Sequence, residues 1–451
     1  MSDNFGKSLG VALISGSLLQ GALADATYRT PRAGEAYQTE LWSRRVTAPA
    51  RDRRRVTALD LGVQYIPNGP SSPDILPFGG ALLVEDTDNQ GEDVLQPFGA
   101  VFVWRNPEHG RHRLRGVFSG LYNDVRFNIA PRLLGGAEVV FTFENFNVPF
   151  ARPEYVEGRR IEAVDLEWQY IRGGLGLGYR RALAPGHQDN ALEITLTYEP
   201  GFIWFEPDDD TARGFIEPRD TYEGRGHLRL RADALERNLM ELPHWGYTAG
   251  TDFIYGHRAN WREWGETGDA AVFGVADAEA ERDYFAASFY AMVAGGVPFL
   301  DSERHRLTAS LHGGIGQDLD RFSAFRLSSK PTAGEWEAVS RPDLPGTVFD
   351  EFFSRSYGIA ELRYRYEALF FFYPYVRANW AWIDRPRFQE NGQIGNQMDS
   401  LPSLGAGFIS GAPWRSSVEL SYVYNFGILR DEDGDPGFGG HSILFQWAKE
   451  F

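Results

Sequence analysis

The sequence of 451 residues predicts an all-β protein, a transmembrane antiparallel β-barrel of about 16 strands with long extracellular loops and short periplasmic turns. Three observations support this prediction. Apolar and polar residues alternate with period two in many segments. No run of about 18 apolar residues follows the first 24, which argues against membrane helices. The alternation also continues to the last residue, Phe451.

The alternating segments place charged residues on one face of each predicted strand. In 225–235, Leu228 and Leu230 alternate with Arg229 and Arg231. A soluble sheet with one solvated face would alternate in the same way. The membrane is favoured because the pattern recurs along the whole chain, and because arginine and glutamate share the polar faces, as suits a water-filled lumen. The residues expected to face the lumen are Arg113, Arg115, Arg229, Arg231, Glu361, Arg363 and Arg365.

The alternating segments number sixteen, and bacterial barrels have an even number of strands. If the first strand runs outward, every second connection is extracellular and should be long. Two connections break this rule: 146–160 is too long for a periplasmic turn, and the break near Gly173 is too short for a loop. The predicted strands are 56–66, 96–106, 111–122, 135–145, 161–172, 173–182, 190–203, 225–235, 245–256, 283–296, 304–315, 355–367, 369–382, 401–410, 415–426 and 441–451. The expected extracellular loops are 67–95, 123–134, 204–224, 257–282, 316–354, 383–400 and 427–440.

The N-terminus predicts a secretory signal peptide in residues 1–24. Lys7 precedes an apolar run, and Ala22-Leu23-Ala24 has the form of a cleavage site. The alternative is a short buried helix at the start of a cytosolic domain. Residues 25–55 would then form a polar periplasmic leader, either a tail or a segment that enters the barrel, and 56–451 the barrel itself.

The composition excludes several classes of protein. The chain has no Cys, which rules out disulfides and thiolate metal sites. A net charge of −17 argues against nucleic acid as a partner. The 32 Phe, 20 Tyr and 12 Trp fit the aromatic girdles of a barrel, although an aromatic-rich soluble β protein would share them.

The last strand ends on an aromatic residue. Counting back by twos from Phe451 gives Lys449, Trp447, Phe445 and Ile443. An alternating last strand with a terminal aromatic resembles the signal that the barrel-assembly machinery of Gram-negative bacteria recognises. The C-terminal assembly signal is therefore expected at Ile443, Phe445, Trp447 and Phe451.

The segment 311–384 resembles the barrel of the bacterial surface antigen superfamily, the BamA/TamA-like outer-membrane assembly factors. The aromatic stretch with Phe322 and Phe325 is similar to the family's approach to its long sixth loop, although Ser328 and Ser329 replace the usual glycines. Leu344-Pro345-Gly346, followed by Glu351, resembles the loop tip that folds back into the lumen. Pro345 stands where typical members have Arg. Asp384 is similar to the family's strand-end Asp, and the resemblance implies that it faces the lumen.

The resemblance implies a stand-alone barrel that acts in protein insertion or export. About thirty residues separate the expected signal from the first strand, too few for a periplasmic polypeptide-transport-associated domain. The alternative is a passive pore or substrate channel. A barrel enzyme is the third hypothesis, and it predicts a Ser or Asp within hydrogen-bond reach of a His.

No linear catalytic motif is present, so we expect no enzyme, no cofactor and no metal. In the segment 257–266, Trp261 and Trp264 are expected to anchor at the outer membrane interface. The expected partners are outer-membrane lipids, lipopolysaccharide and, during biogenesis, the barrel-assembly machinery. The protein is expected to be a monomer in the bacterial outer membrane.

Overall fold

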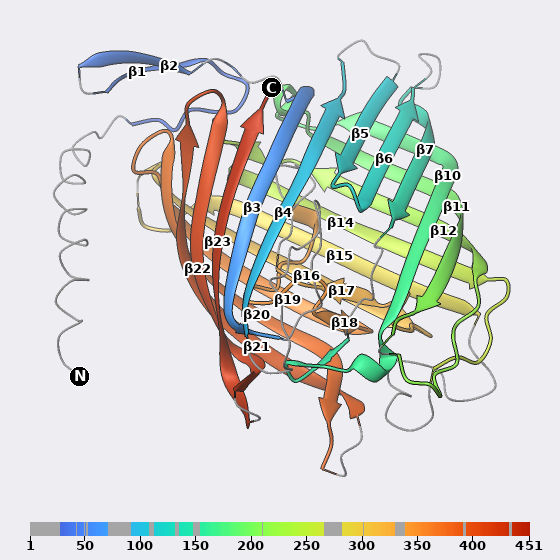
Figure 1. Cartoon of the computed structure of the whole chain (residues 1–451). Coiled ribbons are helices and arrows are strands. Elements are labelled where there is room, and N and C mark those ends of the chain that lie inside the picture. The colour runs from blue at the N-terminus through green and yellow to red at the C-terminus, as the bar shows by residue number, and fades with distance from the viewer. Residues whose placement is uncertain are drawn as a thin grey trace, which may run out of the picture.

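The computed structural model contains one closed antiparallel β-barrel with a long loop in its interior (Figure 1). It describes residues 28–41, 43–48, 50, 53–70, 92–107, 112–130, 135–147, 154–209, 211–265, 282–300, 302–329, 339–390, 394–432 and 435–451. The expected signal peptide, 1–24, lies outside the described residues. In the described part of the chain, no helix is long and apolar enough to cross a membrane.

Sixteen strands build the barrel wall, and consecutive strands are neighbours around it. They are β3 (Arg55–Gly69), β4 (Glu92–Arg105), β5 (His112–Phe118), β6 (Tyr122–Ile129), β7 (Ala137–Phe146), β10 (Leu166–Ala182), β11 (Ala191–Pro207), β12 (Thr221–Asp233), β14 (Pro243–Arg258), β15 (Asp283–Gly296), β16 (His305–Gln317), β19 (Ser356–Tyr366), β20 (Phe372–Phe388), β21 (Ile394–Ala412), β22 (Ser416–Glu432) and β23 (Asp435–Glu450). The two-residue strand β13 (Glu236–Arg237) adds to the edge of β14.

The first and last strands close the barrel. β23 pairs with β3 over eight residue pairs, from Ile443 with Tyr65 to Glu450 with Ala58. The amide of Phe451 donates to the carbonyl of Thr57 at 2.9 Å, so the pairing continues to the last residue. This seam is longer than the β4–β5 pairing, which has five pairs.

The two faces of the wall differ in polarity. Large apolar side chains point outward and are exposed, with Leu177 at 70% and Tyr198 at 61%. The inward face carries buried charged residues. A belt of exposed apolar side chains around a closed barrel is what lipid contact requires, since lipid-facing and lumen-facing residues alternate along each strand.

Two sequence predictions about the strands were wrong. One strand was predicted as two and another was missed, so the predicted total of sixteen strands was still correct. The predicted strands 161–172 and 173–182 are one continuous strand, β10, which pairs across Gly173 with Phe143 of β7. The predicted loop 123–134 instead contains β6, joined to β5 by a tight turn at 119–121.

With these corrections the connections separate into two ends of the barrel. We call the end that holds 106–111, 130–136, 183–190, 234–242, 297–304, 367–371 and 413–415 the turn end, and the opposite end the loop end. Both earlier exceptions disappear, because β7 ends and β10 begins at the loop end and no break occurs at Gly173. Two expected loops, 383–400 and 427–440, are largely strand: β20 with β21 and β22 with β23 extend into long hairpins.

The leader lies across the turn end, beside the C-terminus (Figure 1). It contains a hairpin of β1 (Tyr37–Leu41) and β2 (Arg44–Ala48). Before the hairpin, residues 28–34 run along the turns of the wall. Thr30 donates its amide to Glu303 at 2.9 Å, and Ala33 donates its amide to the carbonyl of Arg237 at 2.9 Å. The leader therefore packs against the barrel mouth.

Replacing Arg32 by Gln is expected to loosen residues 28–34. Arg32 pairs with Glu236 and with Glu303, and its side chain is largely buried. Loss of these charged contacts should cost about 1–2 kcal/mol, so the amides of Thr30 and Ala33 should exchange hydrogen roughly tenfold faster. The matched control is Arg29→Gln, since Arg29 is exposed. Equal exchange in the two variants would contradict the contact.

Candidate functional site: a loop folded into the barrel lumen

The connection from β16 to β19 spans residues 318–355, and its described parts, 318–329 and 339–355, fold into the barrel. It contains a short ladder of β17 (Phe325–Leu327) and β18 (Phe352–Ser354), in which Leu327 pairs with Phe352. Its first turn is held by Asp320, whose carboxylate accepts the amides of Phe322 and Ser323 at 3.1 and 3.0 Å. The loop thus leaves the wall as an ordered turn and ladder before it crosses the lumen.

The tip of the loop is fixed to β22 by a buried ion pair. Glu351 and Arg430 pair directly, and their side chains are only 1% and 2% exposed. The Arg430 guanidinium also donates to the carbonyl of Gly346 at 3.0 Å. Gly346 has a φ of +90°, which favours glycine, and an added Cβ would lie 3.1 Å from the Cβ of Asn425.

Two further hydrogen bonds hold the backbone of the tip. The side-chain amide of Asn425 donates to the carbonyl of Pro345 at 2.9 Å, and the side-chain amide of Gln64 donates to the carbonyl of Thr347 at 3.0 Å. Asn425 belongs to β22 and Gln64 to β3, so the tip spans the inner wall on both sides of β23. We call this set of contacts, with the Glu351–Arg430 pair, the tip latch.

The base of the loop is fixed by an aromatic cluster. Phe322 lies edge-on to Trp168 and Trp261 at 5.4 and 5.9 Å between ring centroids, and Trp264 lies 4.9 Å away. The prediction that Trp261 and Trp264 anchor at the membrane interface is wrong, since both are buried in this cluster. Trp261 and Trp264 point into the barrel because Phe322 of the loop gives them an apolar partner in a lumen that is otherwise polar.

Charged contacts surround the aromatic cluster. Glu154 is buried between two arginines: it forms an ion pair with Arg321 at 3.1 Å and accepts a hydrogen bond from Arg326 at 2.9 Å. Burial lowers the pKa of the Arg321 guanidinium, while the carboxylate of Glu154 acts in the opposite direction. Arg258 of β14 pairs with Asp320 at the first turn. These pairs tie the base of the loop to the loop end of the wall.

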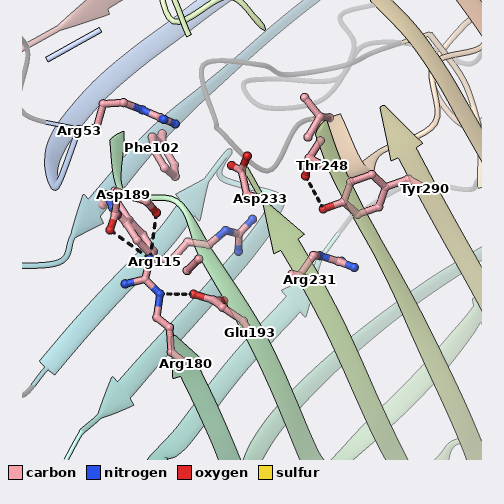
Figure 2. Close-up of a pocket in the computed structure, with 13 residues that line it drawn as sticks. Arg53, Phe102, Arg115, Arg180, Asp189, Glu193, Arg231, Asp233, Thr248 and Tyr290 are labelled. Atoms are coloured by element: carbon pink, nitrogen blue, oxygen red, sulfur yellow. Dashed lines mark hydrogen bonds and ion pairs between the residues drawn. The ribbon is translucent and has the colours of Figure 1, made fainter. Parts of the chain in front are cut away.

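The segment 339–350 separates the interior into cavities. Below it, toward the turn end, lies a space of about 1720 Å³ with open solvent included, and above it a space of about 1830 Å³. A smaller space of about 630 Å³ lies beside Val339, and Figure 2 shows charged side chains converging on it. The loop therefore occupies the centre of the lumen, with charged cavities around it.

Ion pairs line the inner wall next to these cavities. Arg113 pairs with Glu138 and Glu193, and Arg180 also reaches Glu193, at 2.7 Å (Figure 2). Asp252 accepts from Arg229 and Arg231 at 2.9 and 2.7 Å in the same way. Glu193 and Asp252 are each shared by two arginines, so arginine exceeds carboxylate in these clusters and the wall is polar and basic there.

The structure places seven of the eight expected lumen residues on the inward face. Arg113 is buried in its ion pairs, and the others line the cavities: Arg115, Arg229, Arg231, Glu361, Arg363 and Arg365. Asp384 is the exception. It lies on the same face of β20 as Trp380 and Trp382, which are 50% and 45% exposed, so its expected lumen position is wrong. The inward neighbour Arg385 pairs with Asp399 instead, at 2.6 Å.

The expected loop residues lie in two groups. Phe322 is in the aromatic cluster at the base, and Phe325 packs on Tyr357 at 5.1 Å between ring centroids. The tip latch uses Pro345, Gly346 and Glu351 directly, while Leu344 is buried beside it. Sequence reasoning missed the partners Arg430, Asn425 and Gln64.

The last strand presents its aromatic residues outward. Ile443, Phe445 and Phe451 are exposed and Trp447 is half-buried, all on the face opposite the lumen. Lys449 lies over the ring of Phe451, with its Nζ 4.7 Å from the ring centroid. This arrangement leaves the expected assembly signal accessible at the turn end.

The described residues contain one buried His–Asp contact. His227 Nε2 lies 2.8 Å from Asp252, while its Nδ1 lies 3.3 Å from Glu199. Both ring nitrogens thus face carboxylates, which is the geometry of a charge network and leaves neither nitrogen for a hydroxyl nucleophile. Among the described residues, no group of three or more His, Asp or Glu is arranged to hold a metal ion.

Comparisons with known proteins show similarity to solved structures alone. No family model and no curated protein matches the chain. The chain is similar to BamA from Haemophilus ducreyi lacking POTRA domains 1–3, with 8% identity, a TM-score of 0.47, and coverage of 91% of this chain and 75% of that one. It is also similar to CdiB from Escherichia coli, with 12% identity, a TM-score of 0.47, and coverage of 96% and 69%. A third is outer-membrane expressed OmpT of Vibrio cholerae, with 8% identity, a TM-score of 0.34, and coverage of 88% and 97%. At these identities and scores, the similarities carry nothing about activity, substrate or partner.

Proposed function

We propose that this protein is a gated barrel of the outer membrane, of the assembly-factor type, which inserts or exports polypeptide when the loop tip leaves the wall. The tip latch carries the proposal. It joins Glu351 of the loop to Arg430 of β22, and Thr347 of the loop to Gln64 of β3, on the two sides of the last strand. Release of the tip would free both the lumen and the wall that flanks the seam.

The energetics of the latch favour a barrel that is closed at rest. Breaking a buried ion pair by leaving one charge unpaired costs about 3–5 kcal/mol. Water that enters as the tip leaves would solvate Glu351 and Arg430 and reduce this cost. A gap of a few kcal/mol leaves roughly 0.1–10% of molecules in the minor state, so a substrate that binds the open state could shift the population.

A passive pore is the alternative, and the cavities favour it. The spaces above and below the segment 339–350 are both lined with charged side chains, including Arg341, which borders each of them. If the loop is small enough to let ions pass beside it, the intact protein would conduct. In that case the loop would narrow the pore, and the tip latch would set its width.

The test is folding of an outer-membrane protein in liposomes. Urea-unfolded substrate barrel is added to liposomes that contain the purified protein, to empty liposomes, and to liposomes with the Arg430→Gln variant. The proposal predicts that the substrate folds severalfold faster with the protein than in empty liposomes. It also predicts that the folding rate with the variant differs from the rate with wild type. The control is Arg181→Gln, because Arg181 is exposed at the turn end. Folding at the rate of empty liposomes would reject the proposal.

A further inference from the structure

The cavity at the loop end has two chemically different walls. We call it the loop-end chamber; its volume is about 1830 Å³ with open solvent included. It lies between the inner faces of β5, β6, β7, β10, β12, β14 and β15 and the loop segments 322–327, 340–342 and 349–350. The contacts described above surround this chamber and do not fill it. The chamber is large enough for a small organic molecule.

One wall of the chamber is rich in arginine. Arg225, Arg229 and Arg231 alternate along β12 and so point to the same side. Asp252 is shared by the last two, while Arg225 has Glu199 at 3.6 Å, which is beyond hydrogen-bond length. Of the charged residues that line the chamber, seven are arginines and four are carboxylates. They are Arg115, Arg172, Arg225, Arg229, Arg231, Arg326 and Arg341, with Asp124, Glu144, Asp252 and Asp350.

Arg225 is the cation of this wall with the weakest protein contacts. Its side chain is 12% exposed, and the buried Nε has no hydrogen-bond partner among the described residues. A buried guanidinium nitrogen without a partner is costly. Arg225 also lines the chamber, so an anion there would accept a charge-assisted hydrogen bond from the accessible part of its guanidinium.

The other wall is aromatic. Phe146, Trp168 and Tyr170 lie within about 6 Å of one another, with ring planes tilted by 19–35°. All three line the chamber, and Phe322 closes the cluster from the loop. Arg172 lies 3.9 Å above the ring of Tyr170, so the aromatic wall meets the basic wall at that point. A flat apolar group could therefore stack on one wall while its charge faces the other.

We propose that the loop-end chamber binds an organic anion, a molecule with a flat apolar body and a carboxylate, sulfonate or phosphate group. The arginines of β12 would hold the anionic group, as arginine suits planar oxyanions, and the aromatic residues would hold the body. None of the tip-latch residues lines the chamber, but the loop that they hold supplies part of its wall, so the site is complete only in the closed barrel.

The test uses the fluorescent probe pyrenetetrasulfonate, which has a flat aromatic body and four sulfonates. Its anisotropy is titrated with purified protein in detergent. Saturable binding is expected, weakening as salt is raised. Arg225→Gln and, separately, Arg231→Gln should each raise the Kd about tenfold, which is the effect of losing about 1.4 kcal/mol of charge-assisted contact.

Two controls make the result decisive. Arg181→Gln removes an exposed arginine at the opposite end of the barrel and should leave the Kd unchanged. The thermal midpoint of each variant shows whether it is folded; Arg225→Gln should be, because Glu199 keeps its hydrogen bond from Thr197 at 2.8 Å. Absence of saturable binding to the wild type, or equal Kd values for all variants, would overturn the proposal.

Discussion

Replacing Arg430 by Gln is expected to release the loop tip and to open the lumen to ions. The substitution leaves the Glu351 carboxylate buried without its charge partner, and it also removes the donor to the carbonyl of Gly346. Such a loss costs about 3–5 kcal/mol, which is more than two hydrogen bonds from Asn425 and Gln64 are expected to supply. The tip segment carries Glu335, Glu337 and Glu351, whereas its Lys330 and Arg341 are each followed by proline and resist trypsin. The released loop should therefore be cleaved faster by a glutamate-specific protease, and the protein should conduct in a planar bilayer.

A double-mutant cycle separates the ion pair from its surroundings. Glu351→Gln alone leaves Arg430 unpaired, and the double variant Glu351→Gln with Arg430→Gln should recover part of the loss, since no buried charge then remains alone. Arg181→Gln is the control for a change of net charge. Cleavage and conductance of Arg430→Gln at wild-type values would show that the pair does not hold the tip.

Replacing Phe322 by Ala is expected to detach the base of the loop from the wall. Phe322 is buried among Trp168, Phe205, Trp261 and Trp264, and truncation of a buried phenylalanine costs about 3–5 kcal/mol. The base should open more often, so trypsin should cleave after Arg321 and Arg326 much faster than in wild type. Limited proteolysis followed by mass spectrometry locates the cuts.

The conservative variant Phe322→Leu keeps most of the buried volume and should cost less than half as much. Its cleavage should lie between wild type and Phe322→Ala. If both variants resist trypsin as wild type does, the cluster is not the anchor of the loop. Because the tip latch is unchanged in both variants, the tip contacts are expected to keep the lumen closed.

The alternation of the sequence predicted the barrel and most of its strands, because it reports the two faces of a wall directly. The alternation led to a wrong strand boundary at Gly173, because the adjacent glycines Gly173 and Gly174 are typical of a turn. Gly174 is needed within the strand, since an added Cβ would lie 2.1 Å from the hydroxyl of Thr142 on β7. The strand β6 was missed because the tight turn at 119–121 has too little sequence signal to end the preceding strand.

The site could be predicted on the loop but not on the wall. The resemblance selected Gly346 and Glu351, yet nothing in the sequence pointed to Arg430, which lies in a segment expected to be loop. The register of β22 against β23 shifts between Asn425 and Leu429. This irregularity breaks the period of two, so alternation cannot assign Arg430 to a face. Partners that come together only through tertiary packing leave no local pattern.

Electrical recording of a loop variant tests the closed barrel most directly. Residues 328–351 are replaced by Asn-Gly, a two-residue turn that joins the register partners Leu327 and Phe352 into a hairpin. This change removes the lumen segment and the tip latch and keeps the aromatic anchor at Phe322. Wild-type protein in a planar bilayer should show little steady conductance, and the variant should show stable ohmic conductance. Equal conductance of the two proteins would contradict a lumen closed by the loop.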